Sequence, residues 1–92
     1  MSYMNIKLPS ELNIRQVAEL KEPLNEALNA DSDIVLDASD VDMVDTAALQ
    51  LLLAFIRQAA LKKRPVEWRS VPDDFLNTVK LMGLGEGLNL QV

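Results

Sequence analysis

The sequence predicts a single α/β domain with a four- or five-stranded mixed sheet and three principal helices. Short apolar segments with strand character alternate along the chain with segments of helical periodicity, and this alternation is typical of parallel strands joined by helical crossovers. The chain has 92 residues, of which 49% are apolar, and this suffices for one core. We therefore expect one domain over residues 1–92, with the element order β-β-α-β-α-β-α-β.

Two short strands are predicted near the start of the chain, at residues 5–8 and 11–14. Both segments alternate in part between apolar and polar residues, and Pro9 and Ser10 between them are typical of a turn. Because proline cannot donate to a strand ladder, Pro9 favours an edge position.

A helix is predicted from about Val17, where apolar residues begin to recur mostly at intervals of three and four. The apolar face consists of Val17, Leu20, Leu24, Ala27 and Leu28. Pro23 falls inside this pattern, and an interior proline removes a backbone hydrogen bond and clashes with the preceding turn. Two alternatives remain open: the ordered helix begins only a turn before Pro23, or it bends there.

The middle of the chain carries the clearest strand, loop and helix pattern. Residues 34–36, Ile-Val-Leu, are typical of a strand buried on both faces. A loop with aspartates at positions 37, 40, 42 and 45 follows, and the helix after it has the apolar face Leu49, Leu52, Leu53, Ile56 and Ala60. Asp45 is placed to cap this helix, and the basic residues 62–64 and Pro65 end it.

The last third of the chain predicts a strand, a shorter helix and a terminal strand. Residues 66–69 alternate between apolar and polar and include Trp68, which we expect in the core. The next helix has the apolar face Phe75, Leu76, Val79 and Met82, and Gly83 is placed at its end. The alternation of Leu88, Leu90 and Val92 with polar residues predicts the terminal strand.

The composition argues against several classes of function. The formal net charge is −5, with 14 acidic and 9 basic residues, so nucleic acid and membrane surfaces are poor partners. The chain has no Cys and no His, and it therefore lacks thiol chemistry and the side chain most often used for acid–base catalysis and zinc binding. No signal peptide or membrane-spanning segment is visible, so we expect a cytoplasmic protein without direct membrane insertion.

Residues 34–60, IVLDASDVDMVDTAALQLLLAFIRQAA, resemble the signature of STAS domains, the family of sulfate-transporter and anti-sigma-factor-antagonist domains. That signature is an apolar strand ending in Asp, a short acidic-apolar loop, and Asp-[Ser/Thr]-x-Gly-Leu at the start of a Leu-rich helix. Here Asp37 ends the strand, and residues 45–49, Asp-Thr-Ala-Ala-Leu, occupy the position of the core motif. Ala48 stands where the family has glycine. The order and lengths of the flanking elements also fit, so the resemblance covers nearly the whole chain.

The resemblance implies a non-enzymatic protein-interaction module. In anti-sigma factor antagonists of this family, the Ser or Thr after the second Asp is phosphorylated by a partner kinase that is also the anti-sigma factor, and only Thr46 matches that position. The threonine and the Leu-rich run after it are closer to two other branches. One is the small cytoplasmic STAS subunit that docks on the ATPase of the lipid-asymmetry ABC transporter, and the other comprises STAS proteins found with chemotaxis components. The expected partner is thus a serine/threonine kinase or anti-sigma factor, a chemotaxis component or an ABC transporter ATPase.

The residues expected to bind this partner lie in and around the motif: Asp37, Asp45, Thr46, Ala47, Ala48, Gln50 and Arg57. A phosphate on Thr46 would lie at the electropositive start of a helix and would add about −1.5 to −2 charges beside the aspartates. It would thereby repel an acidic partner surface. A Mg²⁺-dependent phosphoacceptor is the enzymatic alternative, but the first two predicted strands contain only Glu11 as an acidic residue. We expect no cofactor, no metal and no catalytic residue.

Overall fold

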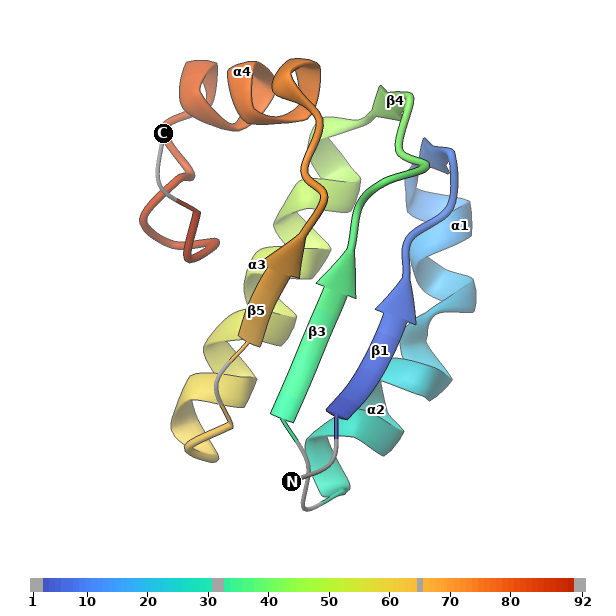
Figure 1. The fold of residues 1–92 in the computed structure, drawn as a ribbon, viewed down its shortest axis with the longest axis vertical. Helices are drawn as coiled ribbons and strands as arrows, with labels where there is room; N and C mark the ends of the chain where they lie inside the picture. Colours follow the sequence, from blue (N-terminus) through green and yellow to red (C-terminus); the bar gives the residue numbers. More distant parts are fainter. Residues whose placement is uncertain (1–2, 31–32, 65, 91–92) are drawn as a thin grey trace.

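The computed structural model describes residues 3–30, 33–64 and 66–90, and its ribbon is shown in Figure 1. Five strands and four helices follow one another along these residues. In chain order they are β1 (Tyr3–Lys7), β2 (Glu11–Leu12), α1 (Ile14–Glu19), α2 (Lys21–Asn29), β3 (Asp33–Asp37), β4 (Met43–Val44), α3 (Thr46–Leu61), β5 (Val66–Arg69) and α4 (Asp73–Leu81). The predicted α/β class is confirmed.

The strands form a three-stranded sheet in the order β1-β3-β5 and a separate pair, β2-β4. Every ladder between described strands is parallel, with Met4 opposite Ile34 and Ile34 opposite Val66. The predicted mixed sheet of four or five strands is therefore wrong in its strand directions and in the size of the sheet, because the five described strands divide into three and two. The physical reason for the parallel directions is that each connection between neighbouring strands of the larger sheet contains a helix, and a helical crossover returns the chain in the same direction. Four helices are described where three principal helices were predicted.

Three helices cover one face of the larger sheet. Figure 1 shows α1, α2 and α3 behind the strands, with α4 beyond their carboxyl ends. Alternate strand residues are buried in the core with the helices: Ile6, Ile34, Leu36 and Val66. The opposite face is polar, with Asn5 and Glu67 exposed on either side of Val35. Val35 is nevertheless only 1% exposed and lies outside the main core cluster.

The helical segment is interrupted at Leu20, between α1 and α2, and this interruption answers the question raised by Pro23. The first helix begins at Ile14, and the second begins at Lys21 and places Pro23 in its first turn. In a continuous helix the ring of Pro23 would clash with the carbonyl of Glu19, so the break removes that clash. The strand predicted at residues 11–14 is limited to Glu11–Leu12, because the side chain of Asn13 accepts a 2.9 Å hydrogen bond from the Gln16 N–H and caps α1.

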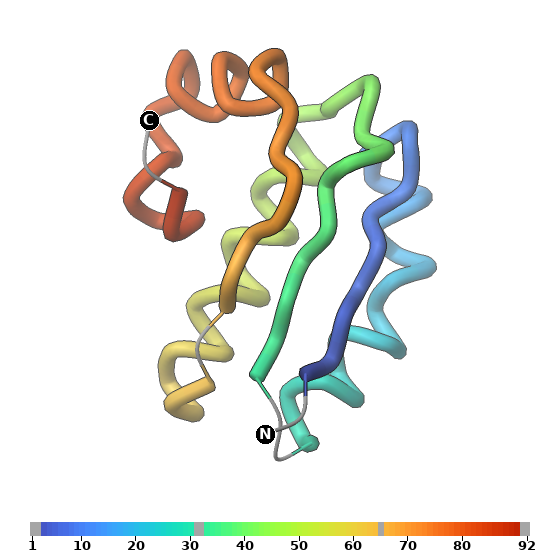
Figure 2. The backbone as a smooth tube through the Cα atoms, in the orientation of Figure 1, coloured from blue at the N-terminus to red at the C-terminus, as the bar shows by residue number. Residues whose placement is uncertain are grey.

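The terminal strand predicted around Leu88 and Leu90 is wrong within the described residues, and Val92 lies outside them. This segment instead turns, because the Leu90 N–H donates to the Gly85 carbonyl at 2.8 Å and Asn89 adopts a φ of 64°. The turns lie against β5 through side chains. Trp68 Nε1 donates to the Leu88 carbonyl at 2.8 Å, and Asn89 Nδ2 donates to the Val66 carbonyl at 3.1 Å. Figure 2 shows the segment near β5, on the opposite side of the sheet from β1.

The two helices that follow the acidic loop and β5 end in the same manner. Gly83 follows the last residues of α4 with a φ of 68°, as predicted for a helix end. The Gly83 N–H donates to the Lys80 carbonyl, and the Leu84 N–H donates to the Val79 carbonyl. This pair of bonds is the Schellman motif. At the end of α3 the equivalent left-handed residue is Lys63, with a φ of 57°.

Candidate functional site

The acidic loop of residues 37–45 connects β3 to α3 and includes the short strand β4. Two of its residues anchor it in the core, since Ala38 is fully buried and Val41 is 7% exposed. Backbone bonds also fasten the loop to the segment around β2. The N–H groups of Asp42 and Met43 donate to the Ser10 carbonyl at 2.8 and 3.0 Å, and the Asp45 N–H donates to Leu12 at 2.8 Å. The start of α3 is therefore held in a defined position.

Asp37 at the end of β3 stabilises the first turn of this loop. Its Oδ1 accepts a 2.9 Å hydrogen bond from the Ser39 N–H. That backbone bond is the main reason why the pKa of Asp37 lies below its ordinary value, and the Ser39 side chain and the charges of Lys7 and Arg69 add to the effect. Asp37 is thus an ionised, half-buried group at the base of the loop. Its expected contact with a partner stays a prediction.

Asp45 caps α3, as predicted. It has an extended backbone with φ −102° and ψ 142°, and its Oδ1 accepts a 3.3 Å hydrogen bond from the Ala47 N–H. Thr46 is the first residue of the helix and is exposed. Because Asp45 provides the cap, the Thr46 hydroxyl is not needed for it, and this hydroxyl makes no hydrogen bond to the described part of the chain.

Gln50 and Arg57 lie on the same stripe of α3 as Thr46. Intervals of four and eleven residues are close to whole turns of a helix with about 3.6 residues per turn, and all three residues are exposed. Ala47 beside them is half-buried. Ala48 does not belong to this surface: it is fully buried on the opposite side of the helix, so its predicted direct contact with a partner is wrong for the chain in this conformation.

A family model described as "Mlab, STAS domain" matches residues 2–91. The chain belongs to the STAS family. No match was found among the curated proteins. STAS domains are in general regulatory or interaction modules rather than enzymes.

The STAS motif lies beside an exposed apolar residue that the sequence reasoning missed. Met43 is 63% exposed, whereas Val41 two positions earlier is 7% exposed. Nothing in the spacing of Val41 and Met43 predicts this exposure, because residues two apart in an extended segment share a face. The available signal was an apolar residue between Asp42 and the Val44–Asp45 pair in an otherwise acidic loop. An ion pair was also missed: Lys7 Nζ lies 3.3 Å from Asp40 Oδ2.

The aspartates around this STAS motif do not converge. Within residues 3–30, 33–64 and 66–90, no group of three or more Asp or Glu side chains is arranged to hold a metal ion. Over the same residues, no helix has the length and apolar character that crossing a membrane requires. The start of α3 and the loop before it thus present exposed carboxylates, the Thr46 hydroxyl without a hydrogen bond to the described residues, and the exposed Met43 side chain.

Proposed function

We propose that this STAS domain binds a protein partner reversibly through the start of α3, and that phosphorylation of Thr46 weakens the complex. The surface consists of Asp45, Thr46, Ala47, Gln50 and Arg57, with Met43 beside it. One observation carries the proposal: the exposed hydroxyl of Thr46 is free because Asp45 caps the helix in its place.

The rest of α3 supports this role because it makes the surface rigid. Its opposite side is buried and includes Leu49, Leu52 and Phe55. A partner that contacts the exposed stripe therefore meets side chains whose backbone is already ordered, and little conformational entropy is lost on binding.

A phosphate at Thr46 would change the charge of the surface more than its shape. It would add about −1.5 to −2 charges where Asp42 and Asp45 are already exposed. The free N–H groups and partial positive charge at the start of α3 would stabilise that phosphate locally. An acidic partner surface would then be repelled while the domain stays folded.

Site-specific photo-crosslinking in cells tests whether this surface is bound. A photoreactive amino acid is placed at Thr46, Gln50 or Arg57, and at Asn77 as a control that is exposed on α4. We expect the first three positions to give one common crosslinked protein that Asn77 does not give. Crosslinking from Asn77 alone, or from no position, would contradict the proposed surface.

The affinity of that purified protein for two variants then tests the switch. Thr46→Glu should weaken binding at least about tenfold, which is roughly 1.4 kcal/mol, while Thr46→Ala should weaken it much less. The thermal stability of Thr46→Glu should not fall, because a negative charge at a helix start is favourable. Equal binding by wild type and both variants would remove Thr46 from the mechanism.

The alternative is a STAS subunit that docks on the ATPase of a lipid-asymmetry ABC transporter, with Thr46 as a contact and no phosphorylation. The threonine at position 46 and the Leu-rich run after it favour this branch. The crosslinked protein distinguishes the two: an ATPase indicates the transporter subunit, and a serine/threonine kinase that adds one phosphate to Thr46 indicates the switch.

A further inference from the structure

We propose that the outer edge of β1 binds an extended, basic segment of a partner protein as an additional strand. β1 stands at one end of the order β1-β3-β5, and no strand among the described residues pairs with its other side. Figure 2 shows this edge on the side of the molecule opposite the C-terminal turns. The proposal does not depend on Thr46 or on its phosphorylation.

The free backbone groups of this edge belong to Tyr3, Asn5 and Lys7. The Leu8 N–H donates to the Asp37 carbonyl at 2.9 Å, so the backbone groups of Leu8 point toward β3. In a parallel ladder, alternate residues point the same way, and Ile6 and Met4 therefore also bond β3. The N–H and C=O groups of the residues between them point away from the sheet and are available to an added strand.

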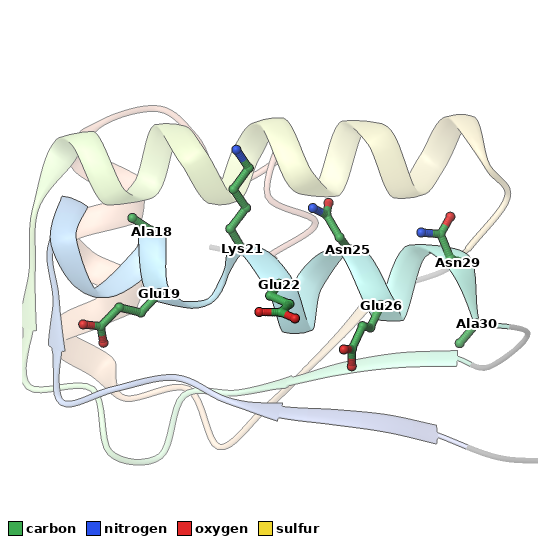
Figure 3. Close-up of a pocket in the computed structure, with 8 residues that line it drawn as sticks. All are labelled: Ala18, Glu19, Lys21, Glu22, Asn25, Glu26, Asn29 and Ala30. Atoms are coloured by element: carbon green, nitrogen blue, oxygen red, sulfur yellow. The ribbon is translucent and has the colours of Figure 1, made fainter.

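A row of carboxylates lies next to this edge and determines which charge the added segment carries. Glu19 at the end of α1 and Glu22 and Glu26 on α2 are exposed, and the four-residue spacing of Glu22 and Glu26 places those two on one side of α2. In Figure 3 their carboxylates project to the strand side of α2, whereas Lys21, Asn25 and Asn29 lie on the side of α3. Within the described residues, none of the three glutamates forms an ion pair.

The helix side of β1 offers apolar surface below that row. Met4 is half-buried at the sheet edge and packs against the core, and α2 contacts β1. A lysine or arginine in the added strand could lay its aliphatic stem along Met4 and extend its charged head toward the glutamates. Because strand side chains alternate between faces, we infer a segment with a basic residue at every second position.

A second copy of this chain fits the same edge poorly. Pairing two β1 edges would place both α2 helices on the same face of the joined sheet, with their glutamate rows adjacent. Each chain already carries a net charge of −5, so such a pair would be repelled at low ionic strength. Charge complementarity therefore favours a basic partner segment.

The test uses the full chain labelled with ¹⁵N and a short synthetic peptide in which lysine alternates with threonine. We expect the peptide to shift the amide signals of Tyr3, Asn5 and Lys7 and to slow their hydrogen exchange. A matched peptide with glutamate in place of lysine should produce neither effect. Signals shifted mainly in the loop of residues 37–45, or equal effects of both peptides, would overturn the proposal.

Two sets of variants separate backbone pairing from charge. Asn5→Pro removes an outward N–H without removing a bond to β3 and should weaken peptide binding about tenfold, while Asn5→Thr should bind like the wild type. If Asn5→Pro does not fold, replacement of Glu19, Glu22 and Glu26 by Gln provides the test.

Each lost surface pair contributes about two- to fivefold in affinity at low salt, so the triple Gln variant should bind the lysine peptide clearly more weakly. Asp73→Asn with Asp74→Asn neutralises carboxylates at the start of α4 and serves as the charge control, which should retain the affinity. Equal loss in the control and the glutamate variant would refute the site. A peptide-free dimer that protects the β1 amides would also refute it, in favour of the second copy. Thr46→Glu should leave peptide binding unchanged.

Discussion

The indole N–H of Trp68 donates a 2.8 Å hydrogen bond to the backbone carbonyl of Leu88. This bond joins β5 to the turns that follow α4, twenty residues later in the chain. The Trp68 ring also packs against Phe75, with the ring centroids 5.5 Å apart. The half-buried Trp68 side chain thus bonds the C-terminal turns to β5, where a terminal strand would have used backbone hydrogen bonds.

Trp68→Phe should destabilise the domain by about 1–2 kcal/mol, because it removes this donor and part of the ring while keeping an aromatic contact with Phe75. Urea denaturation followed by far-ultraviolet circular dichroism measures the change. Trp68→Ala should cost clearly more. If Trp68→Phe is neutral, the bond to Leu88 does not stabilise the folded chain.

Lys63→Gly should stabilise the domain by about 0.5–1 kcal/mol. Lys63 has a φ of 57° at the end of α3, and a left-handed conformation costs a non-glycine residue roughly 1–2 kcal/mol, which exceeds the added entropy cost of glycine. Lys62→Gly is the matched control. Lys62 has a φ of −91° and gains nothing from glycine, so the control should lower the melting temperature.

Asp37→Asn should destabilise the domain at neutral pH, and its effect should shrink in acid. The pKa of Asp37 in the folded chain is lowered from its ordinary value of 3.8, so around that pH the folded chain binds fewer protons than the unfolded chain. The stabilisation by Asp37 is therefore present above 3.8 and is lost as the pH falls through the lowered pKa.

Urea midpoints of the wild type and Asp37→Asn across this pH range measure that dependence. Ser39→Ala is the control, because it keeps the backbone N–H that is the main cause of the pKa shift and should retain most of the pH dependence. A difference between wild type and Asp37→Asn that does not vary with pH would show that the shift is absent.

Asp45→Ala should cost about 0.5–1 kcal/mol through loss of the cap on α3. Asp45→Asn keeps an oxygen acceptor for the Ala47 N–H and should cost less. Thr46→Ala, one position later, should change the free energy of unfolding by no more than about 0.5 kcal/mol. Thermal melts of the three variants compare them. A larger cost for Thr46→Ala than for Asp45→Ala would assign the structural role to the threonine.

The sequence predicted the helices with a wide apolar face well. The boundaries of α3 follow from the periodicity of Leu49, Leu52, Leu53 and Ile56 and from Asp45, because both the buried side and the cap are local properties of the chain. Ala60, predicted on the same face, is exposed, and Ala59 is buried instead. The exposure of Thr46, Gln50 and Arg57 follows from the same periodicity. The family assignment was also accessible, because the motif is contiguous.

Structural features that depend on residues far apart in the chain could not be predicted from the sequence. The two-residue strand β4 forms because the carbonyls of Ser10 and Leu12 accept hydrogen bonds from the N–H groups of residues 42, 43 and 45. The sequence of residues 43–44 does not predict this pairing. The alternation at Leu88 and Leu90 suggested a strand, but the left-handed Asn89 and the bond from Trp68 give turns instead.

The burial of Ala48, by contrast, is predictable from the sequence. Ala48 lies four residues before Leu52 and therefore on the same buried face of α3.

The most direct test of the central claim is the affinity of the crosslinked partner for the chain that carries phosphothreonine at position 46, compared with the unmodified chain. The account predicts that phosphorylation raises the dissociation constant at least about tenfold and leaves the melting temperature unchanged or slightly higher. Equal affinities of the two forms would contradict the proposed switch.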